Sequence, residues 1–109
     1  MDYKLVYITT SGVEEAEKIG RTLVTERLAA CVNILAGMRS LYWWEGRVQD
    51  ETEAVLLAKT TGERLEALTA RVKSLHSYDC PCVVALGLAG GNQEFLAWIE
   101  RETSPGARE

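Results

Sequence analysis

The residues best suited to bind a metal ion lie in one short stretch that contains a histidine and two cysteines. His76 is the only histidine of the chain, and imidazole is a common neutral metal ligand. Cys80 and Cys82 follow it in a C-x-C pattern, and their thiols are soft ligands that suit Cu(I) or Zn. These three residues are the candidate metal ligands.

Each of these residues also has a structural interpretation. His76 stands at the expected end of a helix, where it can equally be a capping cation or a packed side chain. The C-x-C spacing is shorter than that of a zinc knuckle, and only an extended segment would put both sulfurs on one face. Cys80 and Cys82 can therefore be buried, inert thiols, and Cys31, within a strand-forming run, is expected to be a core residue.

Polar residues also stand in strand-forming segments that otherwise look buried: Asn33, Tyr42, Glu53 and Lys59. A buried charge normally has a partner or a ligand. One interpretation is that these side chains form hydrogen bonds and salt bridges at a subunit junction. The alternative is a pocket between protomers for a small anion or a metal complex, with Lys59 and Asn33 as binding groups and Trp44 as an apolar wall. These five residues form the candidate inter-subunit cleft.

The overall composition excludes several classes of protein. The net charge is −4 and neither lysine nor arginine forms a dense run, so nucleic-acid binding is not expected. No apolar stretch reaches the roughly 18 residues of a membrane span, and the N-terminus does not read as a secretory signal. The three cysteines are an odd number in a chain large enough to fold without disulfides, which predicts free thiols and a cytoplasmic location.

Apolar periodicity places these residues on an ordered set of elements. At 109 residues the chain is expected to be a single domain, residues 1–109, with a polar tail from about 103 to 109. The expected elements are strand 4–9, helix 13–28, strand 29–48, strand 53–60, helix 63–76, strand 83–88 and a short helix around 95–99. This order predicts an α+β fold of the ferredoxin-like type, a βαββαβ sandwich with an antiparallel sheet and a C-terminal helix.

The strand-forming run from Ala29 to Val48 is long and shows no strong hairpin signal. Ala36-Gly37 is interpreted as a bulge, and the turn is expected at Gln49–Thr52. Trp43 and Trp44 point to opposite faces of a strand, so they cannot both enter one small core. A second protein surface is expected to cover one of them, which makes this strand the predicted junction between subunits.

The sequence resembles the CutA divalent-cation-tolerance family over nearly its whole length, as far as Trp98. The positions that carry the resemblance are Ala30-Cys31-Val32-Asn33-Ile34, Ser40-Leu41-Tyr42, Trp44, Gly46, Glu53, Lys59-Thr60-Thr61, His76, Tyr78, Pro81, Asn92 and Trp98. The resemblance implies a ferredoxin-like protomer, a tight cytoplasmic homotrimer and a non-enzymatic role in tolerance of divalent metals such as copper. That role is expected to act through weak metal binding or through signalling to partners. The partners expected are then other copies of the chain, a divalent cation or Cu(I), and a small anion.

Two features depart from the family pattern. Some members carry a cysteine near the end of the first strand and a second histidine before His76, whereas this chain has Ile8-Thr9-Thr10 and Leu75 at those places. Cys82 stands where the family usually has a glutamate, so it is either a replacement ligand or a drifted thiol. A copper site assembled from the family's ligands is therefore incomplete in this chain.

The main alternative is a small-molecule sensor similar to the PII signalling proteins, which share the trimeric ferredoxin-like plan and bind ligands between subunits. Such sensors depend on a long mobile loop between the second and third strands, and the expected link at 49–52 leaves no room for one. An enzyme using Lys59 and Glu53 is a third possibility. No G-x-S-x-G elbow, P-loop or G-x-G-x-x-G cradle is present, so catalysis is not expected.

Overall fold

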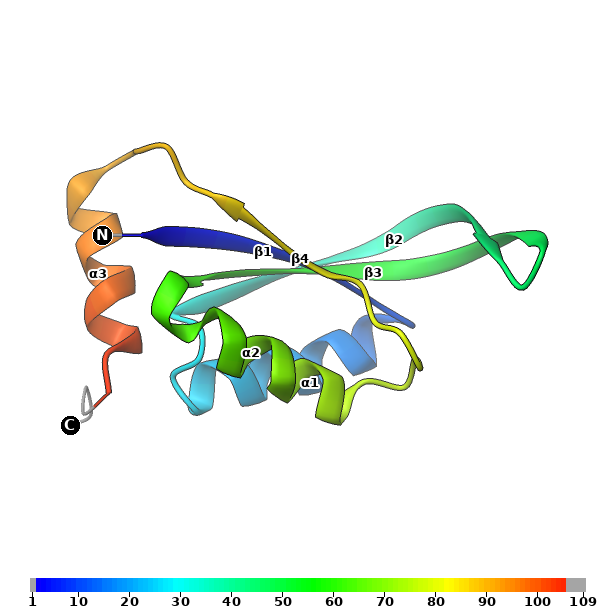
Figure 1. Cartoon of the computed structure of the whole chain (residues 1–109), viewed down its shortest axis with the longest axis horizontal. Coiled ribbons are helices and arrows are strands. Elements are labelled where there is room, and N and C mark those ends of the chain that lie inside the picture. Colours follow the sequence, from blue (N-terminus) through cyan, green and yellow to red (C-terminus); the bar gives the residue numbers. More distant parts are fainter. Residues whose placement is uncertain (1, 106–109) are drawn as a thin grey trace.

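The computed structural model describes residues 2–105 and contains a four-stranded sheet and three helices (Figure 1). The elements in chain order are β1 (Tyr3–Thr10), α1 (Val13–Thr25), β2 (Cys31–Trp44), β3 (Arg47–Thr61), α2 (Gly62–Leu75), β4 (Val83–Gly87) and α3 (Gln93–Thr103). The strand order is β2-β3-β1-β4, and every neighbouring pair is antiparallel. This confirms the predicted α+β, ferredoxin-like fold with a C-terminal helix.

One face of the sheet is covered by α1 and α2, which lie side by side beneath it (Figure 1). The largest fully buried side chains of this core are Val6, Ile8, Ile19, Leu23, Leu56, Leu68 and Val72. α1 approaches β2 closely at Gly20, which has no side chain. A Cβ added there would lie only 2.9 Å from Cγ2 of Val32. A larger residue at position 20 would push the helix away from the strand.

The opposite face of the sheet, which we call the open face, carries the residues that alternate with the core. Leu56 of β3 packs in the core, so its neighbours Val55 and Leu57 point to the open face. By the strand register, Val84 and Leu86 of β4 lie on the same face, and both are more than half exposed. α3 lies at one end of the sheet (Figure 1), so much of this apolar face has no helix over it.

The C-terminal end of α1 differs from the predicted range. The first helix was expected to reach residue 28 but ends at Thr25, because Arg27 adopts φ 61° and the chain leaves the helix. The N–H groups of Arg27 and Leu28 donate to carbonyls of the last helical turn at 3.0 and 2.8 Å, which is a Schellman ending.

The predicted tail at 103–109 begins too early. Thr103 is the last residue of α3 and is buried, and its Oγ1 donates to the carbonyl of Ile99 at 2.8 Å. Arg64 of α2 donates from Nε to the carbonyl of Thr103 at 2.7 Å, which ties the helix end to the domain. Residues 106–109 of the predicted tail lie outside the described residues.

The predicted turn at Gln49–Thr52 is wrong, and the unbroken strand to Val48 is wrong with it. The chain reverses at Glu45-Gly46, where both residues have positive φ (52° and 76°), as in a type I′ hairpin. Gln49–Thr52 instead forms part of β3. The bulge at Ala36-Gly37 is confirmed, because the β2–β3 register shifts between Leu35 and Met38.

Beyond the bulge, β2 and β3 continue as a two-stranded hairpin that projects past the helices (Figure 1). We call residues 38–53 the hairpin arm. Trp43 is 73% exposed and Leu41 is 65% exposed, both on the face that the helices cover farther down the sheet. Trp44 points the other way and is 47% exposed, so the predicted opposite orientation of the two tryptophans is confirmed.

Candidate functional site

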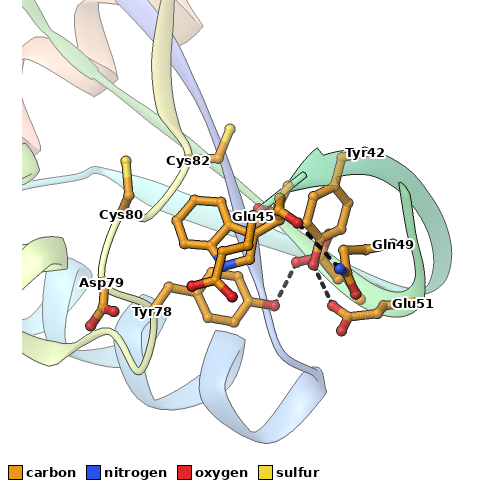
Figure 2. Close-up of a pocket in the computed structure, with 11 residues that line it drawn as sticks. Tyr42, Glu45, Gln49, Glu51, Tyr78, Asp79, Cys80 and Cys82 are labelled. Atoms are coloured by element: carbon orange, nitrogen blue, oxygen red, sulfur yellow. Dashed lines mark hydrogen bonds between the residues drawn. The ribbon is translucent and has the colours of Figure 1, made fainter. Parts of the chain in front are cut away.

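A cavity of about 610 Å³ lies where the hairpin arm meets the segment between α2 and β4 (Figure 2). Its lining residues are Thr9, Tyr42, Trp44, Glu45, Gln49, Glu51, Glu53, Tyr78, Asp79, Cys80 and Cys82. Its volume falls in the range of small-molecule sites in proteins. Five residues of the two predicted sites are among the lining residues.

The hairpin register explains how the arm presents its side chains to this cavity. Tyr42 pairs with Gln49, and alternation along the two strands puts Trp44 and Glu51 on the same face. Gln49 also donates from Nε2 to the carbonyl of Trp44 at 3.4 Å, close to the hairpin turn. Since Glu53 follows Glu51 by two residues, the arm alone supplies five lining side chains from one face.

Two tyrosine-glutamate pairs line the cavity, one within the arm and one that links the arm to the segment after α2. The hydroxyl of Tyr42 donates to Oε1 of Glu51 at 2.5 Å, and the hydroxyl of Tyr78 donates to Oε2 of Glu53 at 2.5 Å. The hydrogen bond to Glu51 raises the pKa of Tyr42 to about 12. Burial and the hydrogen bond to Glu53 raise the pKa of Tyr78. Both phenols therefore stay protonated and act as donors at neutral pH.

The charge of the cavity is one-sided. Its lining includes the carboxylates of Glu45, Glu51, Glu53 and Asp79 but no lysine, arginine or histidine of the described chain. Figure 2 shows Cys80 and Cys82 on the opposite side of the cavity from Tyr42 and Glu51. Both cysteines are free, Cys80 being exposed and Cys82 half-buried. The site is therefore acidic, with thiols on one side and aromatic rings with carboxylates on the other.

His76 does not line this cavity, and both of its ring nitrogens are engaged. Nε2 lies 2.7 Å from the carbonyl oxygen of Thr9, and Nδ1 accepts a hydrogen bond from the backbone N–H of Tyr78 at 3.1 Å. This arrangement puts the ring proton on Nε2, and the side chain has no exposed surface. A metal ion could reach either nitrogen only by displacing one of these contacts.

The predicted three-ligand metal site is not assembled in the protomer. Within residues 2–105, no group of three or more His, Cys, Asp or Glu side chains is arranged to hold a metal ion. Of the predicted ligands, Cys80 and Cys82 share the cavity, whereas His76 serves as a packed hydrogen-bonding residue. This matches the packed-side-chain alternative for the histidine.

A half-buried carboxylate, Glu15, holds the segment that carries Tyr78 and the cysteines. Glu15 of α1 accepts hydrogen bonds from the backbone N–H of Ser77 at 2.7 Å and from the backbone N–H and hydroxyl of Ser11 at 2.9 Å. Partial burial alone would raise the pKa of Glu15, but these hydrogen bonds lower it to about 2. Glu15 and His76 together fix the chain where it enters the cavity wall.

The structure separates the predicted cleft into two places. Tyr42, Trp44 and Glu53 line the cavity, but Asn33 and Lys59 lie farther along the sheet, away from the hairpin turn. Lys59 donates from Nζ to Oδ1 of Asn33 at 2.5 Å, and the same nitrogen lies 3.6 Å from the sulfur of Cys31. Cys31 lies half-buried beside this ammonium. It was predicted to be a core residue but is not among the buried residues of the core.

Several residues that line the cavity were not predicted from the sequence. Glu51 and Gln49 were assigned to a turn, so their alternation with Glu53 along one strand face was not recognised. Glu45 falls within the strand predicted over residues 29–48, so it was not recognised as a turn residue. Tyr78 was noted only as part of the family pattern, because its partner Glu53 lies 25 positions away in the sequence.

Comparison with known proteins gives a consistent result. The family model described as CutA1 divalent ion tolerance protein matches residues 4–102. The divalent-cation tolerance protein CutA of Thermus thermophilus is 47% identical over 100 residues, which cover 92% of this chain and 97% of that protein. The chloroplastic protein CutA 1 of rice, Oryza sativa, is 44% identical over 99 residues, which cover 91% of this chain and 56% of that protein. The chain thus spans little more than half the length of its plant relatives.

Solved structures of CutA proteins share this fold. The Thermus thermophilus structure superposes with a TM-score of 0.91 at 46% identity, covering 94% of this chain and 99% of that chain. A CutA from Archaeoglobus fulgidus, described as periplasmic, gives a TM-score of 0.91 at 39% identity and covers 94% and 99%. No helix within residues 2–105 is long and apolar enough to cross a bilayer. The chain belongs to the CutA1 divalent ion tolerance protein family.

Proposed function

We propose that this chain acts as a non-enzymatic homotrimer that contributes to metal tolerance by binding copper weakly, as Cu(I), through Cys80 and Cys82. The observation that carries this proposal is that both free thiols line one acidic cavity. Thiolates are soft ligands that select Cu(I), and surrounding carboxylates favour a cation over an anion. His76 is not part of the proposed site, because its ring nitrogens are engaged by Thr9 and Tyr78.

A reducing, cytoplasmic setting fits this chemistry. The three cysteines are free, and thiols remain reduced in the cytoplasm, where copper can be held as Cu(I). The names of relatives point to more than one compartment, since the rice protein is called chloroplastic and the Archaeoglobus fulgidus structure periplasmic. The cytoplasmic assignment therefore rests on the thiols of this chain.

The proposal of a homotrimer rests on apolar surface that a single copy leaves in water. Large exposed hydrophobic side chains gather on the hairpin arm and the edge strands: Leu35, Leu41, Trp43, Trp44, Val48, Val84 and Leu86. β2 and β4 are the two edges of the sheet, and unpaired edges invite pairing with another chain. A closed ring of copies would cover both features.

A PII-like sensor is disfavoured by the link between β2 and β3. That link consists of Glu45-Gly46 only, so the long loop on which such sensors depend is missing. A small anion remains a proposed ligand of Lys59. Among the described residues its ammonium has no carboxylate partner, and its hydrogen bonds go to Asn33 and Cys31.

The experiment that tests the copper site is a Cu(I) titration against a competing chelator, with native mass spectrometry to report oligomer size and bound metal. The double variant Cys80→Ser/Cys82→Ser should weaken Cu(I) binding by about tenfold or more. The matched control is Cys31→Ser, which removes a thiol outside the cavity and should bind Cu(I) normally. Unchanged affinity in the double variant would refute the site, and a mass of one chain at micromolar concentration would refute the trimer.

A further inference from the structure

Glu53 is a nearly buried carboxylate that has no cationic partner in the described chain. It is 6% exposed, and its one hydrogen bond comes from the neutral hydroxyl of Tyr78. None of the ion pairs found among residues 2–105 involves Glu53. Removing a charge from water is costly unless an opposite charge compensates for it. No group of the described protomer neutralises the charge of Glu53, so a cation from outside the protomer would stabilise it.

One oxygen of Glu53 is available to such a cation. Tyr78 binds Oε2, and no hydrogen bond to Oε1 is present. No described side-chain oxygen or nitrogen is both fully buried and without a hydrogen bond, so Oε1 must retain some accessible surface. Because Glu53 lines the cavity, that surface faces the cavity. Glu51 has the same arrangement, since Tyr42 binds Oε1 and leaves Oε2 free.

The walls beside these carboxylates are aromatic. Tyr42, Trp44 and Tyr78 line the same cavity, and Figure 2 shows the rings of Tyr42 and Tyr78 on either side of the dashed contacts to the carboxylates. Aromatic faces attract ammonium and guanidinium groups, and clusters of rings are a common way to recognise alkylated ammonium ions. Rings and carboxylates thus select the same kind of ligand.

The size of the cavity and its donor set favour an organic cation over a bare metal ion. About 610 Å³ is far more space than one ion needs. The carboxylates of the described chain do not form a group of three or more that could hold a metal. We propose that the arm side of the cavity, formed by Tyr42, Trp44, Glu51 and Glu53, binds a small organic cation with an ammonium or guanidinium group. This inference goes beyond the proposed copper function, which uses the thiols on the other side.

The test is isothermal titration of the full-length protein, in its native oligomeric state, with putrescine, with agmatine and with 1,4-butanediol. The diol has the length of putrescine but no charge, so it separates recognition of the cation from filling of the cavity. Putrescine or agmatine should bind at least about tenfold more tightly than the diol, and added salt should weaken that binding. Equal binding of diamine and diol, or no binding of either cation, would overturn the inference.

Variants locate the site and separate it from the copper proposal. Glu53→Gln should weaken binding of the organic cation by about tenfold, and Glu51→Gln, on a more exposed position, serves as a second variant if the first does not fold. Glu66→Gln removes the same charge from the exposed surface of α2 and should leave binding unchanged. Cys80→Ser/Cys82→Ser should also bind putrescine normally. Loss of putrescine binding in Glu66→Gln, or retention in both cavity variants, would overturn the assignment.

Magnesium chloride provides the remaining control. Mg²⁺ prefers oxygen ligands and its own hydration shell, and it gains less than an organic cation from aromatic walls. Added MgCl₂ should therefore weaken putrescine binding only as much as NaCl of the same ionic strength does. Displacement of putrescine by equimolar Mg²⁺ would show that the site selects charge alone and would overturn the assignment to an organic cation.

Discussion

The helix-covered half of the sheet and the hairpin arm share strands β2 and β3 but bury their apolar side chains to different extents. Around Leu56, helices from the same chain remove the apolar residues from water completely. On the arm, Leu41 and Trp43 are mostly exposed although the backbone is fully paired between β2 and β3. Backbone pairing thus shapes the arm, but burial of its side chains requires a second surface.

The largest expected effect tests the core half of this comparison. Leu56→Ala should lower the free energy of unfolding by about 4 kcal/mol, because it leaves a cavity among fully buried side chains. Leu41→Ala removes the same atoms from the arm, where only another copy of the chain can bury them, and should lower it by no more than about 1 kcal/mol. Urea unfolding at fixed protein concentration measures both. Equal losses would show that the assembled protein buries the arm as tightly as the core.

The two tryptophans test the two faces of the arm. Trp44 faces the cavity side and is 47% exposed, whereas Trp43 faces the other side and is 73% exposed, so we expect Trp44 to lose more contacts on truncation. Trp44→Ala should lower the stability of the proposed trimer by about 3 kcal/mol per protomer, and Trp43→Ala should lower it clearly less. Thermal unfolding with light scattering measures stability and mass together. Equal destabilisation would contradict the difference between the faces.

Hydrophobic periodicity predicted the elements that bury their side chains within one chain. The core stripe of α2, with Leu68 and Val72, and the buried run of β3 around Leu56 repeat at helical and strand spacings that need no knowledge of the rest of the fold. The element order and the bulge at Ala36-Gly37 followed from these local patterns.

The hairpin turn and the cavity could not be predicted in the same way. Glu45-Gly46 lacks the Asn or Asp that usually marks a type I′ turn, and hydrophobic residues on both sides imitate a continuous strand. Cavity residues come from β1, the arm and the segment after α2, so only the fold brings them together. The role of His76 depends on the backbone of Thr9, which carries no side-chain signal in the sequence.

A third prediction concerns Glu15, which connects α1 of the core half to the cavity wall. Its pKa is lowered to about 2 from 4.5, so its hydrogen bonds stabilise the protein above pH 4.5 and are lost as the pH falls toward 2. Glu15→Gln should lower the free energy of unfolding by about 1.5 kcal/mol at pH 7, the lower end for hydrogen bonds to a charged acceptor. The difference from the parent should shrink between pH 4.5 and 2.

Urea unfolding at a series of pH values measures this, and Glu14→Gln is the matched control. Glu14 is the exposed neighbour in the same helical turn, and no hydrogen bond to its side chain is present among the described residues. Its substitution should change stability little at any pH. A difference for Glu15→Gln that stays constant down to pH 2 would contradict the role of the ionised carboxylate.

The smallest effects are expected at the hairpin turn, where Glu45, a residue with a side chain, adopts a positive φ. Gly46 has φ 76° and would accept a Cβ without a clash, so Gly46→Ala isolates the conformational preference of the backbone. It should lower the free energy of unfolding by about 1 kcal/mol, because residues with a side chain disfavour the left-handed region. Glu45 adopts φ 52° although it is not a residue that favours it, so Glu45→Asn should raise stability by a few tenths of a kcal/mol. Equilibrium unfolding of both variants at one protein concentration measures these changes. If Glu45→Asn also destabilises the protein, the cavity-facing carboxylate of Glu45 matters more to the folded arm than the backbone conformation at position 45.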